Sequence, residues 1–146
     1  MKILVIDGQG GGMGRAIVEQ LRAALIKAEI VAVGTNSIAS STMLNAKPDA
    51  VATGENAVIV NCRDADYIIG PLGIIVADAL HGEISPAIAL AIGQSTARRI
   101  LLPVSRCNTY VVGTGDFLLS DMVRRAVELV EKDLSPTKSP PRKVDS

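Results

Sequence analysis

The sequence predicts an α/β fold, namely a Rossmann-like three-layer αβα sandwich around a mostly parallel sheet. Short apolar runs of strand character alternate along the chain with stretches whose apolar residues recur at helical spacing. The first apolar run, at 2–7, leads directly into the glycine-rich segment 8–14, and a helical stretch follows. Strand, glycine turn and helix in this order begin a nucleotide-binding βαβ unit. With right-handed crossovers we expect the strand order 3-2-1-4-5, with an antiparallel edge strand after the fifth.

The first half of the chain is expected to contain two βα units and a third strand. Apolar residues recur at helical spacing after the glycine turn, at Met13, Ile17, Leu21, Ala24 and Leu25. The elements predicted here are a helix over 12–27, a strand over 29–33, a helix over 38–46 that Ser37 caps, and a strand over 49–53.

The segment 55–63 is ambiguous, because its β-branched residues favour a strand. However, the strand expected at 67–70 follows too closely for a parallel crossover between the two. Thr53 can cap a helix that has Glu55 in its first turn and Arg63 in its last turn, which suits the helix dipole. We therefore predict a helix over 55–63.

The second half is expected to complete the sheet. We predict a helix over 74–80 with His81 and Gly82 at its C-cap, a helix over 85–97, a strand over 100–104, and a last helix from the cap residue Asp116 to 134. Residues 106–108 are too few for a helical crossover, so 110–112 is predicted as the antiparallel edge strand. The domain is expected to span 1–134, and the proline-rich segment 135–146 is expected to be a flexible tail.

Composition narrows the classes of function. The 146 residues carry 15 Lys and Arg against 15 Asp and Glu, and the aromatic residues are Tyr67, Tyr110 and Phe117, so nucleic-acid binding is not expected. The apolar content is 48% and the mean hydropathy is +0.33, which predicts a homodimer or larger homo-oligomer joined through 72–80 and 84–92. No run is long enough to span a membrane and no signal peptide is evident, so we expect a cytoplasmic protein with free thiols.

Several segments carry a resemblance to a known family. They are 6–12, 32–37, 53–57, 61–63, 70–74, 82–86 and 103–108. In these segments the chain resembles a family of short bacterial proteins that is described only as a domain of unknown function. The resemblance implies a stand-alone Rossmann-like domain with a glycine-rich turn, and it implies no particular reaction.

Ligands of open parallel sheets bind beyond the carboxyl ends of the strands, where the predicted strands place five glycine-rich or polar segments. The candidate binding residues at this edge are Gly8, Gly10, Gly11, Gly12, Met13, Gly14, Arg15, Thr35, Asn36, Ser37, Thr53, Glu55, Asn56, Gly70, Pro71, Gly73, Ser105 and Asn108. The N–H groups and dipole of the helix after the turn favour an anion there.

The kind of ligand stays open at this point. No acidic residue between Glu29 and Asp49 is available to bind ribose hydroxyls, so the polar segment 35–37 suits a phosphate, as in NADP, with Arg15 as the nearby cation. Asp7 would repel a pyrophosphate unless Mg²⁺ intervened, with Glu55 as a second acid. The preferred alternative is that Asp7 accepts hydrogen bonds from the N–H groups of its own turn.

We therefore expect a ligand-binding or sensing module for a nucleotide or another phosphorylated small molecule. The alternatives are an NADP-linked oxidoreductase or a Mg²⁺-dependent enzyme acting on a nucleotide, and a structural protein without a ligand. The candidate catalytic residues are Asp7, Glu55 and Cys107. The neighbouring Arg106 can lower the pKa of the Cys107 thiol. The spacing of Gly8, Gly12 and Gly14 is similar to that in the glycine turn of short-chain dehydrogenases. However, the chain has no Tyr-x-x-x-Lys pair, which such an enzyme would use for hydride transfer.

Overall fold

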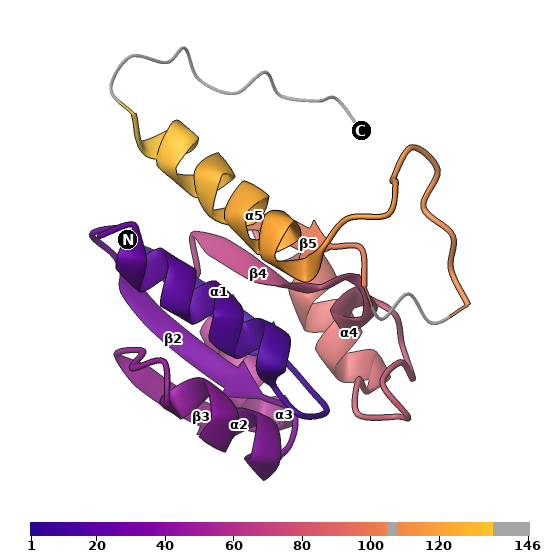
Figure 1. The fold of residues 1–146 in the computed structure, drawn as a ribbon. Coiled ribbons are helices and arrows are strands. Elements are labelled where there is room, and N and C mark those ends of the chain that lie inside the picture. Colours follow the sequence, from indigo (N-terminus) through magenta and orange to yellow (C-terminus); the bar gives the residue numbers. More distant parts are fainter. Residues whose placement is uncertain (105–107, 136–146) are drawn as a thin grey trace.

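The computed structural model describes residues 1–104 and 108–135, which fold around a five-stranded sheet (Figure 1). The strand order is β3-β2-β1-β4-β5, as the sequence predicts, and all neighbouring strands pair in parallel. The elements are β1 Lys2–Asp7, α1 Gly12–Ala23, β2 Glu29–Gly34, α2 Ser37–Leu44, β3 Ala50–Thr53, α3 Glu55–Cys62, β4 Tyr67–Pro71, the 3-10 helix η1 Leu72–Ile75, α4 Pro86–Gln94, β5 Arg98–Leu102 and α5 Leu119–Leu134.

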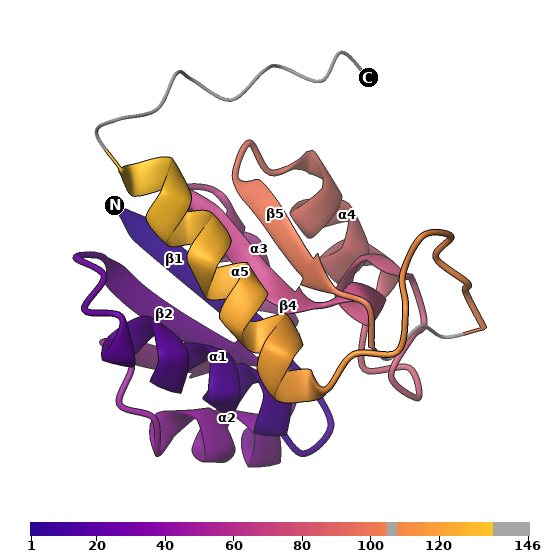
Figure 2. The same ribbon diagram turned by 45° about the horizontal axis from the view of Figure 1, so that its top comes forward.

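Helices cover both faces of the sheet and make the three expected layers. Side chains of β1 alternate between the faces, so that Ile3 and Val5 pack under α1 and α5, whereas Leu4 and Ile6 pack under α3 and α4. Figure 2 shows α1 and α5 in front of the sheet, with α3 and α4 behind it. The fold is therefore Rossmann-like, with the carboxyl ends of all five strands at one edge.

The segment 55–62 is helical, which confirms the choice of helix over strand. Its cap is Gly54, at a φ of 99°, and not Thr53, whose hydroxyl lies 2.6 Å from that of Ser40. The cap of α2 differs in the other direction and lies one residue earlier than predicted. The Asn36 side chain accepts a hydrogen bond from the N–H of Ala39 at 2.8 Å, and Ser37 is the first helical residue.

Helix α1 ends at Ala23, four residues before the predicted end. Leu25 takes a left-handed conformation with a φ of 54°. The Leu25 N–H donates to the carbonyl of Arg22, and the Ile26 N–H donates to that of Leu21. These two bonds form a Schellman closure, with a leucine where glycine is usual. Leu25 is consequently 84% exposed and does not extend the buried stripe.

The helix predicted at 74–80 is wrong. The 3-10 helix η1 ends at Ile75, and a loop over 76–85 leads to Pro86. Asp78, Leu80 and His81 have φ values of 67°, 54° and 56°, which no right-handed helix accommodates. His81 therefore caps no helix. Helix α4 begins after Ser85, whose side chain accepts from the N–H of Ile88, and it ends at Gln94 rather than 97.

The antiparallel edge strand is also wrong, since residues 108–118 form no strand and β5 is the outer strand among the described residues. Tyr110 and Val112 are 75% and 88% exposed. Helix α5 begins at Leu119 without a side-chain cap, so Asp116 is not its cap. The predicted tail at 136–146 lies outside the described residues.

The stretches expected at a subunit interface serve mainly the core of this chain. Ile74, Ile84 and Ile88 are buried on the α4 side of the sheet. Ile75 and Leu90 in the same stretches are exposed, and the homo-oligomer stays a prediction. None of the helices in the described ranges has the length and apolar character that a membrane crossing requires.

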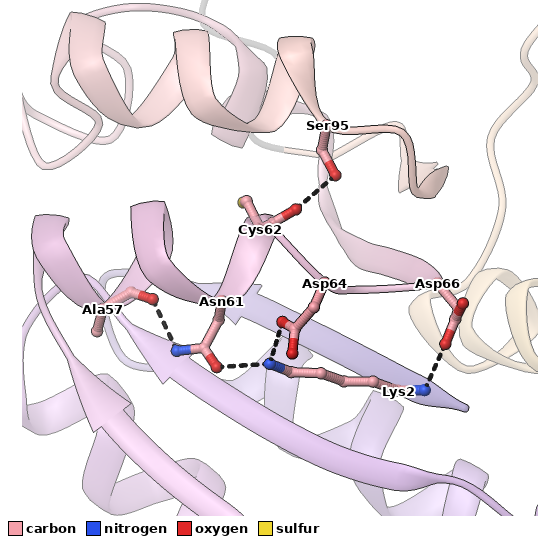
Figure 3. A network of polar contacts seen from close by, with 7 residues as sticks. All are labelled: Lys2, Ala57, Asn61, Cys62, Asp64, Asp66 and Ser95. Atoms are coloured by element: carbon pink, nitrogen blue, oxygen red, sulfur yellow. Dashed lines mark hydrogen bonds and ion pairs between the residues drawn. The ribbon is translucent and has the colours of Figure 1, made fainter.

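A polar network closes the amino-terminal edge of the sheet (Figure 3). The Nζ of Lys2 donates to Asn61 at 2.9 Å and to Asp64 at 2.6 Å, and the Ser95 hydroxyl donates to the carbonyl of Cys62 at 2.8 Å. Burial raises the pKa of the Cys62 thiol to about 11, although the charge of Lys2 acts in the opposite direction. Cys62 is thus a buried thiol at the edge opposite the glycine turn.

Candidate functional site

The glycine turn connects β1 to α1 at the carboxyl edge of the sheet, and three of its glycines are required by the fold. A Cβ on Gly8 would lie 2.7 Å from the Thr35 hydroxyl oxygen. Gly11 has a φ of 75°, and a Cβ there would lie 2.7 Å from the backbone of Ala39. A Cβ on Gly14 would lie 2.8 Å from the Cβ of Asp7. Glycine at these three positions follows from close packing and from one left-handed residue.

Gly10 and Gly12 are different. Neither has a positive φ, and a Cβ added to either would meet no atom within 4 Å. Packing and backbone conformation therefore do not account for glycine at these two positions. An absent Cβ on the open side of the turn leaves the backbone accessible from outside.

The buried carboxylate of Asp7 takes part of the hydrogen-bonding capacity of this turn. It accepts from the N–H of Gly8 at 2.8 Å and from the N–H of Gly14 at 2.7 Å, as the turn interpretation of Asp7 predicts. The N-cap residue of α1 is Gly11, which has no side chain to accept a hydrogen bond from the first helical N–H groups. In the part of the chain that the structure describes, the N–H groups of Gly12 and Met13 have no hydrogen-bond partner. The first turn of α1 thus presents two free donors at its positive end.

Asp7 is less acidic than an ordinary aspartate. Burial raises its pKa, and this outweighs the two backbone hydrogen bonds, which act in the opposite direction. The negative charge of Glu83 adds to the increase. Asp7 therefore has a second carboxylate near it, that of Glu83.

Glu83 is the residue that sequence reasoning missed. It lies in the 76–85 loop, which Figures 1 and 2 show beside the glycine turn. Its Oε1 accepts from the N–H of Gln9 at 3.0 Å, from the Thr35 hydroxyl at 2.8 Å and from the Asn36 side-chain amide. Its Oε2 accepts from the Gln9 side-chain amide. Glu83 therefore joins the glycine turn to the end of β2.

Hydrogen bonding keeps Glu83 ionised. Partial burial by itself would raise its pKa, but the donors on Asn36, Thr35 and Gln9 together outweigh burial and hold the pKa below its usual value. The partners lie 47 to 74 residues away in sequence, so no local pattern identifies this acid.

Three of the other predicted site residues have contacts that serve the fold. Arg15 pairs with Glu19 on the surface of α1 at 2.8 Å. The Glu55 carboxylate accepts from the Ser85 hydroxyl, so it links α3 to the start of α4. A Cβ on Gly70 would collide with the backbone oxygen of Ile6, which explains that glycine by strand packing.

Several candidates make no contact with the turn that would assign them a role. Asn56 is exposed on α3, Pro71 and Gly73 are buried at the end of β4 and in η1, and Asn108 is exposed with a φ of 58°. Ser105 and Cys107 lie outside the described residues. Within the described ranges, no group of three His, Cys, Asp or Glu side chains is arranged to hold a metal ion.

Two hollows lie away from the glycine turn. One, of about 280 Å³, lies between the C-terminal ends of α3 and α4 and includes Cys62 and Ser95. The other, of about 270 Å³, lies between β5 and α5 and includes Leu102, Phe117 and Arg125, with the Arg125 guanidinium 4.4 Å from the centre of the Phe117 ring. The first is lined partly by the structural network of Figure 3, and the second is mainly apolar.

Comparison with known proteins agrees with the family resemblance. The model of the family described as "Domain of unknown function (DUF3842)" matches residues 2–135. The chain belongs to this family. The DUF3842 match covers all eleven elements of the fold, from β1 to α5. No curated protein matches the sequence.

One solved structure similar to this DUF3842 chain is titled as a dodecameric FMN-dependent Ubix-like decarboxylase from Escherichia coli O157:H7. The two are 18% identical, the match covers 91% of this chain and 94% of that chain, and the TM-score is 0.44. A likeness of this size does not extend to ligand or activity, so function has to be argued from the site itself.

Proposed function

We propose that the chain binds a phosphate-bearing small molecule, in the simplest case a nucleotide, at the glycine turn. The observation that carries this proposal is the combination of free donors and open glycines at one place. The N–H groups of Gly12 and Met13 are unpaired among the described residues, and Gly10 and Gly12 leave the space beside them open.

The physical basis is the positive end of α1. Unpaired N–H groups and the helix dipole favour an anion in front of the first turn, and a phosphate fits such donors well. Helix α1 has 12 residues and no acidic side chain in its first turn, so no carboxylate of the helix itself competes for these donors. The turn lies at the carboxyl end of β1, and ligands of open parallel sheets bind at this edge, which supports the proposal.

Two nearby carboxylates set a condition on binding. Asp7 and Glu83 both accept hydrogen bonds from N–H groups of the turn, and an added phosphate is repelled by each ionised group. The donors that surround both carboxylates take up part of their charge, which reduces this repulsion without removing it. We therefore expect Mg²⁺, supplied with the phosphates, to strengthen binding.

A binding or sensing module fits the site better than an enzyme. Of the candidate catalytic acids, Asp7 is occupied by the N–H groups of its turn and Glu55 by the Ser85 hydroxyl. Neither carboxylate is poised to move a proton on a bound ligand, since both already serve the fold.

The proposal is tested by thermal unfolding of the full chain with pyrophosphate, ADP, GDP, NAD and NADP, each with and without Mg²⁺. A ligand that binds only the folded state raises the unfolding midpoint. Native mass spectrometry of the purified protein adds a search for a retained ligand. If no probe raises the midpoint and no phosphate-bearing molecule is retained, the glycine turn is structural and the proposal is wrong.

A further inference from the structure

The acceptor capacity of Glu83 is not exhausted by the protein. Each oxygen of an ionised carboxylate has two lone pairs that can accept hydrogen bonds. Oε1 accepts three hydrogen bonds, from Gln9, Thr35 and Asn36, and is fully used, whereas Oε2 accepts one, from the Gln9 side chain. The side chain is only partly buried. One acceptor position on Oε2 is therefore left for a donor from outside.

The location of this acceptor is informative. In dinucleotide-binding sheets an acid at the end of the second strand accepts hydrogen bonds from ribose hydroxyls. The segment after β2 contains no acid before Asp49, but the loop before α4 brings Glu83 to the same end of β2, onto Thr35 and Asn36.

From this placement we infer that the ligand carries a ribose whose diol is free, and that Glu83 binds that diol. The inference rests on the proposed function, because it concerns the same ligand. One end of the ligand is then an anion at Gly12 and Met13, and the other end is a neutral sugar whose hydroxyl donates to Oε2 of Glu83.

A ribose with a 2′-phosphate does not suit this arrangement. The donors of Thr35 and Asn36, which suggested a phosphate site, are already used by Glu83. A 2′-phosphate would lie against an ionised carboxylate and would find those donors occupied, so repulsion dominates. The expected ligand is therefore of the ADP or NAD type rather than the NADP type.

The loop that holds Glu83 is fixed before any ligand arrives. The N–H of Asp78 donates to the carbonyl of Ile84 at 2.7 Å, and the Gln9 side chain donates to the carbonyl of Leu80 at 3.1 Å. Ile84 is fully buried beside Glu83. A carboxylate held in place in this way binds a hydroxyl without the entropic cost of ordering its loop.

The experiment compares ADP with 2′-deoxy-ADP, which has the same phosphates and lacks one hydroxyl, by calorimetric titration of the full chain. We expect the wild-type chain to bind ADP about tenfold more tightly than 2′-deoxy-ADP, and NAD more tightly than NADP. Glu83→Gln should reduce the ADP preference to about twofold or less. Glu128→Gln, an exposed acid-to-amide change on α5, is the matched control and should leave the preference unchanged.

Pyrophosphate separates failure of this inference from failure of the proposed function. If pyrophosphate binds and ADP binds no better than 2′-deoxy-ADP, the diol inference is wrong and phosphate binding stands. If a folded Glu83→Gln chain still prefers ADP to 2′-deoxy-ADP, or if NADP binds more tightly than NAD, Glu83 does not bind the ribose diol. If neither pyrophosphate nor any nucleotide binds, both proposals fall. The wild-type comparison needs no variant, so a misfolded Glu83→Gln chain does not remove the test.

Discussion

Replacing Gly12 by valine should separate the binding role of the glycine turn from its structural role. Gly12 is the first residue of α1, and its N–H is one of the two free donors. A branched side chain here stands beside those donors and obstructs close approach of a phosphate. We expect affinity for a phosphate-bearing ligand to fall at least about tenfold, which corresponds to roughly 1.4 kcal/mol.

The effect of the same change on folding should be small. Gly12 has no positive φ, and a Cβ there would meet no atom of another element within 4 Å, so neither the backbone conformation nor a neighbouring element opposes a side chain at this position. The remaining difference is helix propensity, which limits the change in the free energy of unfolding to about 1 kcal/mol. Binding and stability therefore respond to this substitution to different degrees.

The assay combines urea unfolding without ligand and thermal unfolding with pyrophosphate or ADP. Gly93→Val is the matched control, because Gly93 also has an open Cβ position but lies in α4, in a helix away from the turn. We expect the Gly93 variant to bind as wild type does. If the Gly12 variant shows the same ligand-induced shift as wild type, the free donors of α1 do not hold the ligand and the reasoning is refuted.

Three further outcomes are expected. Gly14→Ala should lower the free energy of unfolding by about 1–3 kcal/mol in urea, because its Cβ overlaps Asp7 and Met43; an unchanged midpoint would contradict the packing. Glu83→Gln should cost about 1–2 kcal/mol at pH 7. Since hydrogen bonding lowers the pKa of Glu83, this difference should vanish as the pH falls through that lowered pKa, and a difference that persists once the carboxyl group is protonated would show another cause. Iodoacetamide at pH 8 should alkylate Cys62 about a hundredfold more slowly in the folded chain than in urea, given its pKa of about 11; equal rates would refute its burial.

The sequence was sufficient where one physical constraint decided between two structures. The helix at 55–62 follows from the short spacing to β4, although its β-branched residues favour a strand. The strand order follows from alternating strands and helices with right-handed crossovers. Both conclusions depend on connection lengths, which are read directly from the chain.

The failures occur where the chain departs from regular structure without the usual residues. Asp78, Leu80 and His81 take left-handed conformations that normally favour glycine, so an apolar run that resembles a helix forms a loop instead. The same loop carries Glu83, whose partners on β2 and in the glycine turn are distant in sequence. Because 74–80 was predicted as a helix, the position of Glu83 at the end of β2 was not predicted either.

The two carboxylates restrict which ligands the glycine turn can accept. Asp7 occupies the N–H of Gly14, so within the first turn of α1 the donors left for an incoming anion, as far as the described residues show, are the N–H groups of Gly12 and Met13. Glu83 covers the other side of the turn with a negative charge that Gln9 helps to fix. A compact molecule with phosphates at both ends would place one of them against Glu83. A molecule with phosphate at one end and neutral hydroxyl groups at the other would have a favourable partner at each end, so on the proposals made above we expect a nucleotide diphosphate with a free ribose to bind more tightly than a bisphosphate.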